Sequence, residues 1–347
     1  MRVVVTGATG NVGTSVVRAL GEEPEIEQIV GIARRRPAWT PSKTTWVEAD
    51  VVEADLVPIF EGADAVVHLA WAIQPSRDER TLERVNVEGS LRVFDAAVEA
   101  GAGKLVHASS IGAYSKGPSD GRVDESWPTE GTPSSFYARH KAACERMLDR
   151  IEAESPETAV VRLRPALIFR GEAATEIRRL FIGPLLPNAL VDRRLIPAVP
   201  RVEGLSFQVV HSTDVGRAYA RAVLADVRGA FNIAAEPALD TEKVAELLGA
   251  RSVPIPARVL RALAKLTWRL RLQPTPPGWL DMALAVPLMS TDRAREELGW
   301  EPRHSAVEAL EDLLHGLHEG EDFPTPPLEA EGLRGRVAEL KTGVGAR

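Results

Sequence analysis

The chain opens with MRVVVTGATGNVG (residues 1–13), and this stretch decides the fold. Its three consecutive valines favour a buried β-strand. Immediately afterwards, apolar residues at positions 12, 16 and 20 have the spacing of one face of a helix. A strand that passes through a glycine-rich turn into a helix is therefore predicted at the very start of the chain.

Three glycines in this turn have separate predicted roles. Gly7 would permit the sharp turn out of the strand, and Gly10 would let a pyrophosphate approach the backbone. Gly13 would let the helix lie close to the sheet. Backbone N–H groups and the positive end of the helix would then hold the anion. The turn thus predicts a dinucleotide site, with an ordinary strand-to-helix turn as the alternative.

Short β-branched runs alternate with longer segments of helical period from residue 1 to about 165. This alternation is typical of a parallel sheet covered by helices on both faces. We therefore predict an α/β fold with a Rossmann-type, doubly wound parallel sheet in residues 1–170. The expected strands are residues 3–5, 29–32, 45–47, 65–69, 105–108 and 159–163, and the last long helix is residues 136–151.

Beyond Pro165 the chain is rich in proline and loops, which predicts a smaller, mainly helical substrate lobe. This lobe would comprise residues 171–205 and 236–317. Between its two parts, residues 206–235 should return to the first domain through a strand at 207–210, a helix with Thr213 as N-cap and a strand at 231–233. Further helices are expected at residues 257–272, 292–298 and 306–317, and residues 318–347 should form a loosely ordered tail.

The composition excludes several kinds of partner. The 347 residues carry 42 basic and 49 acidic side chains, a net charge of −7, so no basic surface is expected to bind nucleic acid. The single cysteine, Cys144, permits no intrachain disulfide. No apolar run approaches the roughly 20 residues of a membrane helix. We therefore expect a soluble, cytoplasmic protein without nucleic-acid or membrane partners.

No metal site is predicted from the histidines. His68, His107, His140 and His211 lie at expected strand ends or within helical segments. None has a carboxylate or cysteine partner at the spacing of metal ligands. We interpret them as structural residues.

Tyr137 and Lys141 stand four residues apart in the helical segment 136–151, so both side chains share one face. A nearby ammonium would favour the phenolate of a tyrosine, whose pKa is about 10 in water. Ser109 and Ser110 follow the strand at 105–108, at the sheet edge where such folds bind ligands. We predict that Tyr137, Lys141 and Ser110 are catalytic, although two helical surface residues could show the same spacing.

These residues resemble the extended short-chain dehydrogenase/reductase family, also called the NAD-dependent epimerase/dehydratase family. The resemblance extends to about residue 317. It rests on TGATGNVG (6–13), HLAW (68–71), NVEGS (86–90), SSIGAY (109–114), YARHK (137–141), RPALIF (164–169), HSTDVGRA (211–218), FNIAAE (231–236) and ELGWEP (297–302).

The resemblance implies a role for each matching residue. Ser110, Tyr137 and Lys141 would be catalytic, and Lys141 would also contact the nicotinamide ribose. Trp71 departs from the family, because many members have a small residue there. The residues implied to line the cofactor are Gly7, Thr9, Gly10, Asn11, Val12, Gly13, Asp50, Val51, Leu69, Ala70, Trp71, Asn86, Ala108, Tyr137, Lys141 and Pro165.

The end of the second strand bears on the choice of cofactor. It reads GIARRR (31–36), without the carboxylate that would bind an adenosine ribose. Arg34 and Arg35 could instead bind a 2′-phosphate, so NADP is favoured over NAD. Solvated loop arginines are the alternative.

The substrate is expected to be a small molecule of low polarity. No cation stands at residues 205–208, where nucleotide-sugar members usually carry an arginine, and the segment 259–279 is apolar. We therefore predict hydride transfer between NADP(H) or NAD(H) and a carbonyl or alcohol, with Tyr137 as general acid/base. Two alternatives stay open, a nucleotide-sugar epimerase or dehydratase and a non-catalytic dinucleotide-binding protein. Helices near Arg80 and Phe136 could pair in a homodimer.

Overall fold

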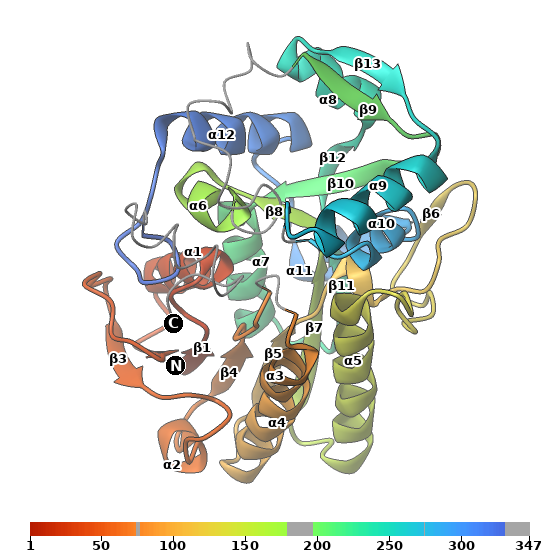
Figure 1. Cartoon of the computed structure of the whole chain (residues 1–347). Helices are drawn as coiled ribbons and strands as arrows, with labels where there is room; N and C mark the ends of the chain where they lie inside the picture. Colours follow the sequence, from red (N-terminus) through yellow and green to blue (C-terminus); the bar gives the residue numbers. More distant parts are fainter. Residues whose placement is uncertain (74–76, 179–196, 274, 330–347) are drawn as a thin grey trace.

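A seven-stranded parallel sheet forms the centre of the protein (Figure 1). The computed structural model describes residues 1–73, 77–178, 197–273 and 275–329. The strand order is β11-β7-β5-β4-β1-β2-β3, and every pair is parallel. All six strands expected before residue 165 are present, so the doubly wound α/β fold is confirmed. The strands are β1 (Arg2–Thr6), β2 (Gln28–Ala33), β3 (Thr44–Glu48), β4 (Ala65–His68), β5 (Lys104–Ala108), β7 (Ala159–Pro165) and β11 (Gly229–Ile233).

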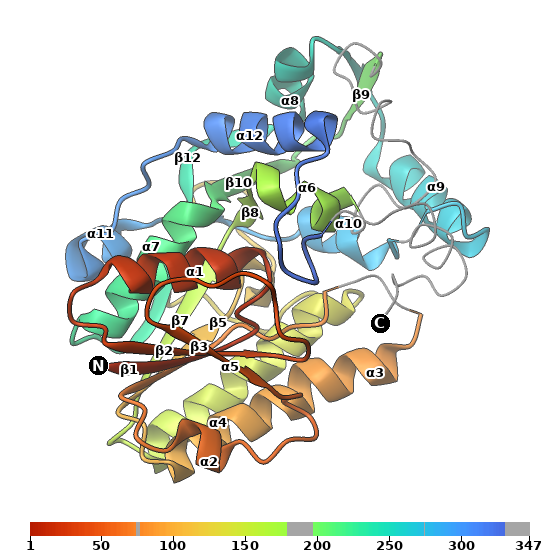
Figure 2. The ribbon, with the colours of Figure 1, turned by 90° about the vertical axis from the view of Figure 1, so that its left-hand side faces the viewer.

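Helices cover both faces of this sheet (Figure 2). One face carries α1 (Asn11–Glu22) and α7 (Ser212–Leu224), and the other carries α2 (Val57–Phe60), α4 (Gly89–Glu99) and α5 (Phe136–Glu154). Helices α1 and α7 approach closely because their contact residues are small. A Cβ atom on Gly216 would lie 2.4 Å from the Ser15 carbonyl oxygen. The sheet thus separates two apolar cores, as its almost continuously buried strands require.

The second lobe contains the predicted C-terminal helices, and it also has a smaller sheet of order β12-β10-β8. Its strands are β8 (Leu167–Phe169), β10 (Ser206–His211) and β12 (Ala235–Asp240), and α12 (Ala306–Glu319) packs across them. The prediction that the strand at 207–210 joins the large sheet is wrong. The chain leaves the large sheet at the end of β7 and forms β8 after a single residue. Strand β10 pairs with β8 and therefore belongs to the smaller sheet.

The remaining elements surround these two sheets. They are α3 (Glu79–Glu83), the π-helix η1 (Arg84–Glu88), the 3-10 helices η2 (Ile111–Ala113) and η3 (Gly171–Ala173), β6 (Arg122–Val123), α6 (Ala174–Ile177), β9 (Ala198–Arg201), α8 (Thr241–Leu248), β13 (Arg251–Pro254), α9 (Ala257–Arg269), α10 (Gly278–Ala283), β14 (Leu288–Met289) and α11 (Asp292–Leu298). Among the described helices, none has both the length and the apolar character needed to cross a bilayer.

The start of α7 differs from the prediction. Thr213 is already inside the helix, and His211 is the N-cap, because its Nδ1 accepts the Thr213 N–H at 3.3 Å. A histidine nitrogen here replaces the usual hydroxyl or carboxylate oxygen.

The chain after α12 also differs from the expected loose tail, as far as it is described. Phe323, Thr325 and Leu328 are all buried. The Phe323 ring lies 5.1 Å from Trp39 and 4.6 Å from the Arg18 guanidinium, centre to centre. Proline and glycine in this stretch therefore shape a packed loop. Residues 330–347 of the expected tail lie outside the described part.

Candidate active site

The glycine loop, residues 6–13, has the geometry expected of a diphosphate cradle. Gly7 adopts φ +68°, and a Cβ atom there would lie 2.6 Å from the Ala70 nitrogen. A Cβ on Gly13 would lie 2.2 Å from the Gly7 oxygen, whereas one on Gly10 would meet no atom closer than 3.7 Å. A ligand could therefore approach the backbone at Gly10 closely. Gly10 is also the N-cap of α1 and offers no capping side chain, so the first N–H groups of the helix can bind an anion.

The segment that follows β4 is held beside this loop. The Ala70 N–H donates to Thr6 Oγ1 at 3.4 Å, and the Ala72 N–H donates to Asn86 Oδ1 at 2.7 Å. Asn86 Nδ2 returns a hydrogen bond to the Ala72 oxygen at 3.1 Å. Asn86, expected to line the cofactor, therefore fixes the backbone after Trp71, and Thr6 holds the backbone before it.

His68, the last residue of β4, connects this strand to β1 and α4 through hydrogen bonds. Its Nδ1 lies 2.7 Å from Thr6 Oγ1 of β1, and its Nε2 lies 2.9 Å from Ser90 Oγ of α4. Burial, reinforced by the charge of Lys141, lowers the pKa of His68 to about 3. The ring is neutral at physiological pH, consistent with a structural role.

The structure brings the three predicted catalytic side chains together. Ser110 follows β5, and its hydroxyl lies near enough to the phenol of Tyr137 on α5 to lower the pKa of that phenol, against the larger effect of burial. Ser110 Oγ also accepts the Gly112 N–H at 3.0 Å. Ser109, by contrast, donates to the Glu145 carboxylate at 2.5 Å. The two adjacent serines therefore have different partners, and only Ser110 faces Tyr137.

Lys141 is nearly fully buried on the same face of α5. Its Nζ donates to the Ala108 oxygen at 2.6 Å and lies 3.3 Å from the centre of the Trp71 ring. Burial lowers the pKa of Lys141 to about 7 and raises the pKa of Tyr137 to about 12. In this conformation burial therefore outweighs the lowering of the phenol pKa by Ser110, and Lys141 is not among the causes of the shift.

Aromatic side chains enclose Tyr137. Trp71 meets it edge-on at 5.9 Å, and Trp279 of α10 lies 5.1 Å away at 33°, measured between ring centres. Met282, also from α10, packs in the same apolar cluster. Helix α10 can approach because Gly278 has no side chain, since a Cβ there would lie 2.2 Å from the Ser134 oxygen. The sequence showed this stretch to be apolar, but not that it covers Tyr137.

Several residues predicted to contact the cofactor lie on the loops that follow β2 and β3. Arg34 and Arg35 follow β2 and are exposed, without a hydrogen bond or ion pair to any described residue. Val51 is buried, and Asp50 Oδ1 accepts the Val52 N–H at 2.9 Å. Sequence reasoning missed Glu48, whose carboxylate accepts the Arg36 N–H at 2.8 Å. Pro165 ends β7, and Val12 lies in the first turn of α1.

A buried ionic network supports the strands under the site. Arg164 donates to both Glu145 oxygens at 2.9 Å and to the Tyr114 hydroxyl at 3.0 Å. Burial raises the pKa of Glu145, but Arg164 and Arg162 hold it below its ordinary value overall. The positions of these arginines in β7 could have indicated the network from the sequence. Two arginines at alternate positions of an otherwise apolar strand require a buried anion.

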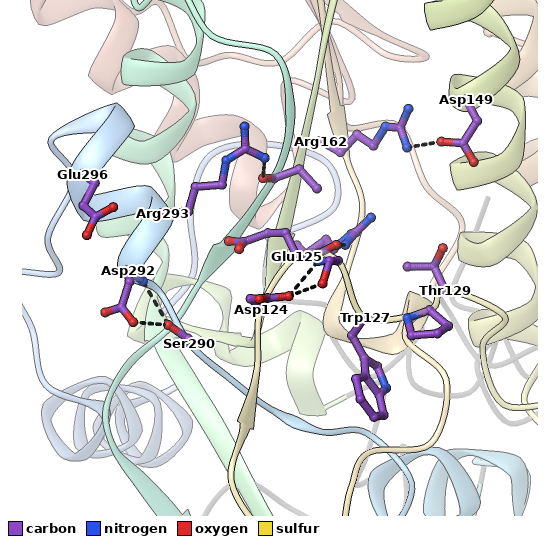
Figure 3. A pocket seen from close by; sticks show the side chains of 14 residues that line it. Asp124, Glu125, Trp127, Thr129, Asp149, Arg162, Ser290, Asp292, Arg293 and Glu296 are labelled. Carbon is purple, nitrogen blue, oxygen red and sulfur yellow. Dashed lines mark hydrogen bonds and ion pairs between the residues drawn. The ribbon is translucent and has the colours of Figure 1, made fainter.

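The surface also has a pocket of about 780 Å³, whose lining residues are drawn in Figure 3. It is lined by residues that include Glu125, Trp127 and Arg293, and neither Ser110, Tyr137 nor Lys141 contributes to it. Several of its charges are already paired, as in the 2.5 Å contact between Arg162 and Asp149. We therefore assign it no part in the chemistry.

Comparisons with known proteins agree with the loop and the fold. The sequence model of the NAD dependent epimerase/dehydratase family matches residues 3–234. The uncharacterized protein Rv2047c of Mycobacterium tuberculosis is 30% identical over 90% of the chain, which spans only 30% of that relative's length. Mouse 3 beta-hydroxysteroid dehydrogenase type 7 is 30% identical over 42% of the chain and 43% of its own length.

Solved structures share the fold at low identity. The UDP-glucuronic acid 4-epimerase of Bacillus cereus, in complex with UDP-glucuronic acid and NAD, has a TM-score of 0.67 and 17% identity. The alignment covers 92% of this chain and 99% of that one. At this identity the likeness concerns the fold alone.

Proposed function

Because the chain belongs to the NAD-dependent epimerase/dehydratase family, we propose that it transfers a hydride between a nicotinamide cofactor and a small molecule. The reacting carbon of the substrate would carry a hydroxyl or carbonyl group. One observation carries the proposal, namely that Ser110, Tyr137 and Lys141 gather beside Trp71, on the segment that adjoins the glycine loop. The fit of the loop to a diphosphate supports it.

Tyr137 would act as the general acid/base. A nicotinamide cofactor, when bound, supplies the hydride acceptor or donor. As the substrate hydroxyl is oxidised, the Tyr137 phenolate takes its proton, and the phenol returns a proton in the reverse direction. Ser110, whose hydroxyl neighbours the phenol, would orient the reacting oxygen. Lys141 would stabilise the phenolate once its ammonium faces the cleft.

The comparisons favour the nucleotide-sugar epimerase or dehydratase within this chemistry. The structurally similar Bacillus cereus protein is named as such an epimerase and binds UDP-glucuronic acid together with NAD. In such a reaction the hydride returns to the substrate, so the cofactor is regenerated.

A second candidate is net oxidation or reduction of a less polar alcohol or ketone. The apolar surroundings of Tyr137, made by Trp71, Trp279 and Met282, favour it. The partial similarity to a hydroxysteroid dehydrogenase points in the same direction. Near-ultraviolet absorbance of reduced nicotinamide distinguishes the two candidates. It changes in proportion to product in net oxidoreduction and shows no net change in epimerisation.

Replacing Tyr137 by Phe tests the common step. We expect turnover to fall by about a hundredfold or more, because the proton donor is lost. The dissociation constant of the cofactor should stay within about twofold. Tyr219→Phe is the matched control, because the buried Tyr219 hydroxyl has no partner among the described residues. Undiminished turnover in Tyr137→Phe would refute the assignment.

A further inference from the structure

The indole of Trp71 covers the ammonium that the proposed function needs. Lys141 Nζ lies 3.3 Å from the centre of the Trp71 ring, which is direct van der Waals contact. Nζ also donates to the Ala108 oxygen at 2.6 Å and lies 5.8 Å from the centre of the Tyr137 ring. No ribose hydroxyl fits between Nζ and the Trp71 ring at 3.3 Å. In this conformation Lys141 cannot contact a nicotinamide ribose from the side that Trp71 occupies.

Hydrogen bonds hold the backbone beside Trp71, whereas its indole is held by ring contacts and by packing against the neighbouring apolar core. The Ala70 N–H donates to Thr6 Oγ1, and Ala72 exchanges two hydrogen bonds with the Asn86 amide, so the backbone is held on either side of Trp71. The indole has ring contacts with Lys141 and Tyr137, and its Nε1 is buried without a partner in the described part of the chain. Because a buried, unpaired donor is costly, rotation of this side chain would recover a hydrogen bond to water.

We propose that Trp71 is a displaceable plug on the catalytic lysine, which must rotate away when the nicotinamide half of a dinucleotide binds. This inference rests on the proposed function and adds a residue that tunes cofactor affinity. The adenosine half meets the glycine loop and does not require the rotation. Binding of a full dinucleotide therefore loses the cation–π contact between Trp71 and Lys141, whereas binding of a mononucleotide does not.

Calorimetric titration of NAD, NADP and ADP into wild-type protein and Trp71→Ala tests the plug. We expect Trp71→Ala to bind both dinucleotides about tenfold more tightly, since a buried cation–π contact no longer competes. ADP lacks the second ribose, so its dissociation constant should be equal in the two proteins. Equal ADP binding also shows that the variant keeps the fold of the glycine loop. Trp71→Phe, which keeps a smaller ring, should lie between the two.

Two results would overturn the plug while leaving the proposed function intact. Equal dinucleotide affinity in wild type and Trp71→Ala would show that the indole does not compete. Weaker affinity in Trp71→Ala would show that Trp71 supports the nicotinamide instead. If wild type and variant bind neither ADP nor a dinucleotide, the proposed function itself fails, and the plug fails with it.

Discussion

The pKa values of Tyr137 and Lys141 differ from the values that these side chains have in water. Tyr137 is held as a phenol and Lys141 sits under an indole, so the free protein stores the pair in its less reactive state. Rehydration of the ammonium would raise the pKa of Lys141 toward its ordinary value and so favour the Tyr137 phenolate. Catalytic competence and cofactor binding are thereby linked through Trp71.

The exposed arginines after β2 allow a prediction about cofactor choice. The double variant Arg34→Ala with Arg35→Ala should lose about tenfold or more in NADP affinity, because charge-assisted hydrogen bonds to the 2′-phosphate disappear. NAD affinity should change by less than about threefold. Arg36→Ala is the control. Titration of both cofactors measures the ratio, and a wild-type preference for NAD would contradict the prediction.

Among the secondary-structure elements, His68 of β4 connects β1 with α4 and makes this part of the fold sensitive to acid. Its pKa falls from 6.5 to about 3 through burial. A lowered histidine pKa stabilises the fold above pH 6.5, and this contribution is lost as the pH falls from 6.5 toward 3. His68→Gln removes the titration. The stability advantage of wild type over this variant should shrink by about 2 kcal/mol between pH 7 and pH 5.

Urea unfolding at the two pH values measures this change. The pKa of the neighbouring His107 is also lowered, mainly by burial and only in smaller part by His68, so His107 titrates in both proteins. Parallel pH profiles of the two proteins would contradict the prediction.

Elements whose sequences carry a local period could be predicted, and those defined by distant partners could not. The large-sheet strands and helices such as α11 follow from apolar runs and spacing. The placement of β10 does not, because its apolar residues suit either sheet and only pairing with β8 decides. Likewise, YARHK indicated Tyr137 and Lys141, but nothing local to Trp279 shows that it packs on the phenol.

Over the whole molecule, the packed loop after α12 joins the far end of the described chain to the glycine loop. Thr325 Oγ1 donates to the Thr9 oxygen at 2.8 Å, and Leu328 is fully buried. Leu328→Ala should therefore lower the free energy of unfolding by about 2–5 kcal/mol through loss of apolar contacts and the cavity left behind. Chemical denaturation measures this effect. The neighbouring exposed Glu329→Ala should change stability by less than about 0.5 kcal/mol, and an equal, small effect of both changes would show that this loop does not pack in solution.

The two sheets are joined by links that are too short to act as a hinge. Only Ala166 separates β7 from β8, only Ala234 separates β11 from β12, and β10 passes directly into α7. A swing of one lobe over the other would have to bend these three connections at once. Ligand entry should therefore require only local rearrangement of side chains such as Trp71, while the backbone of the two lobes keeps its arrangement. Solution scattering of the protein with and without bound cofactor should then show only a small difference in shape.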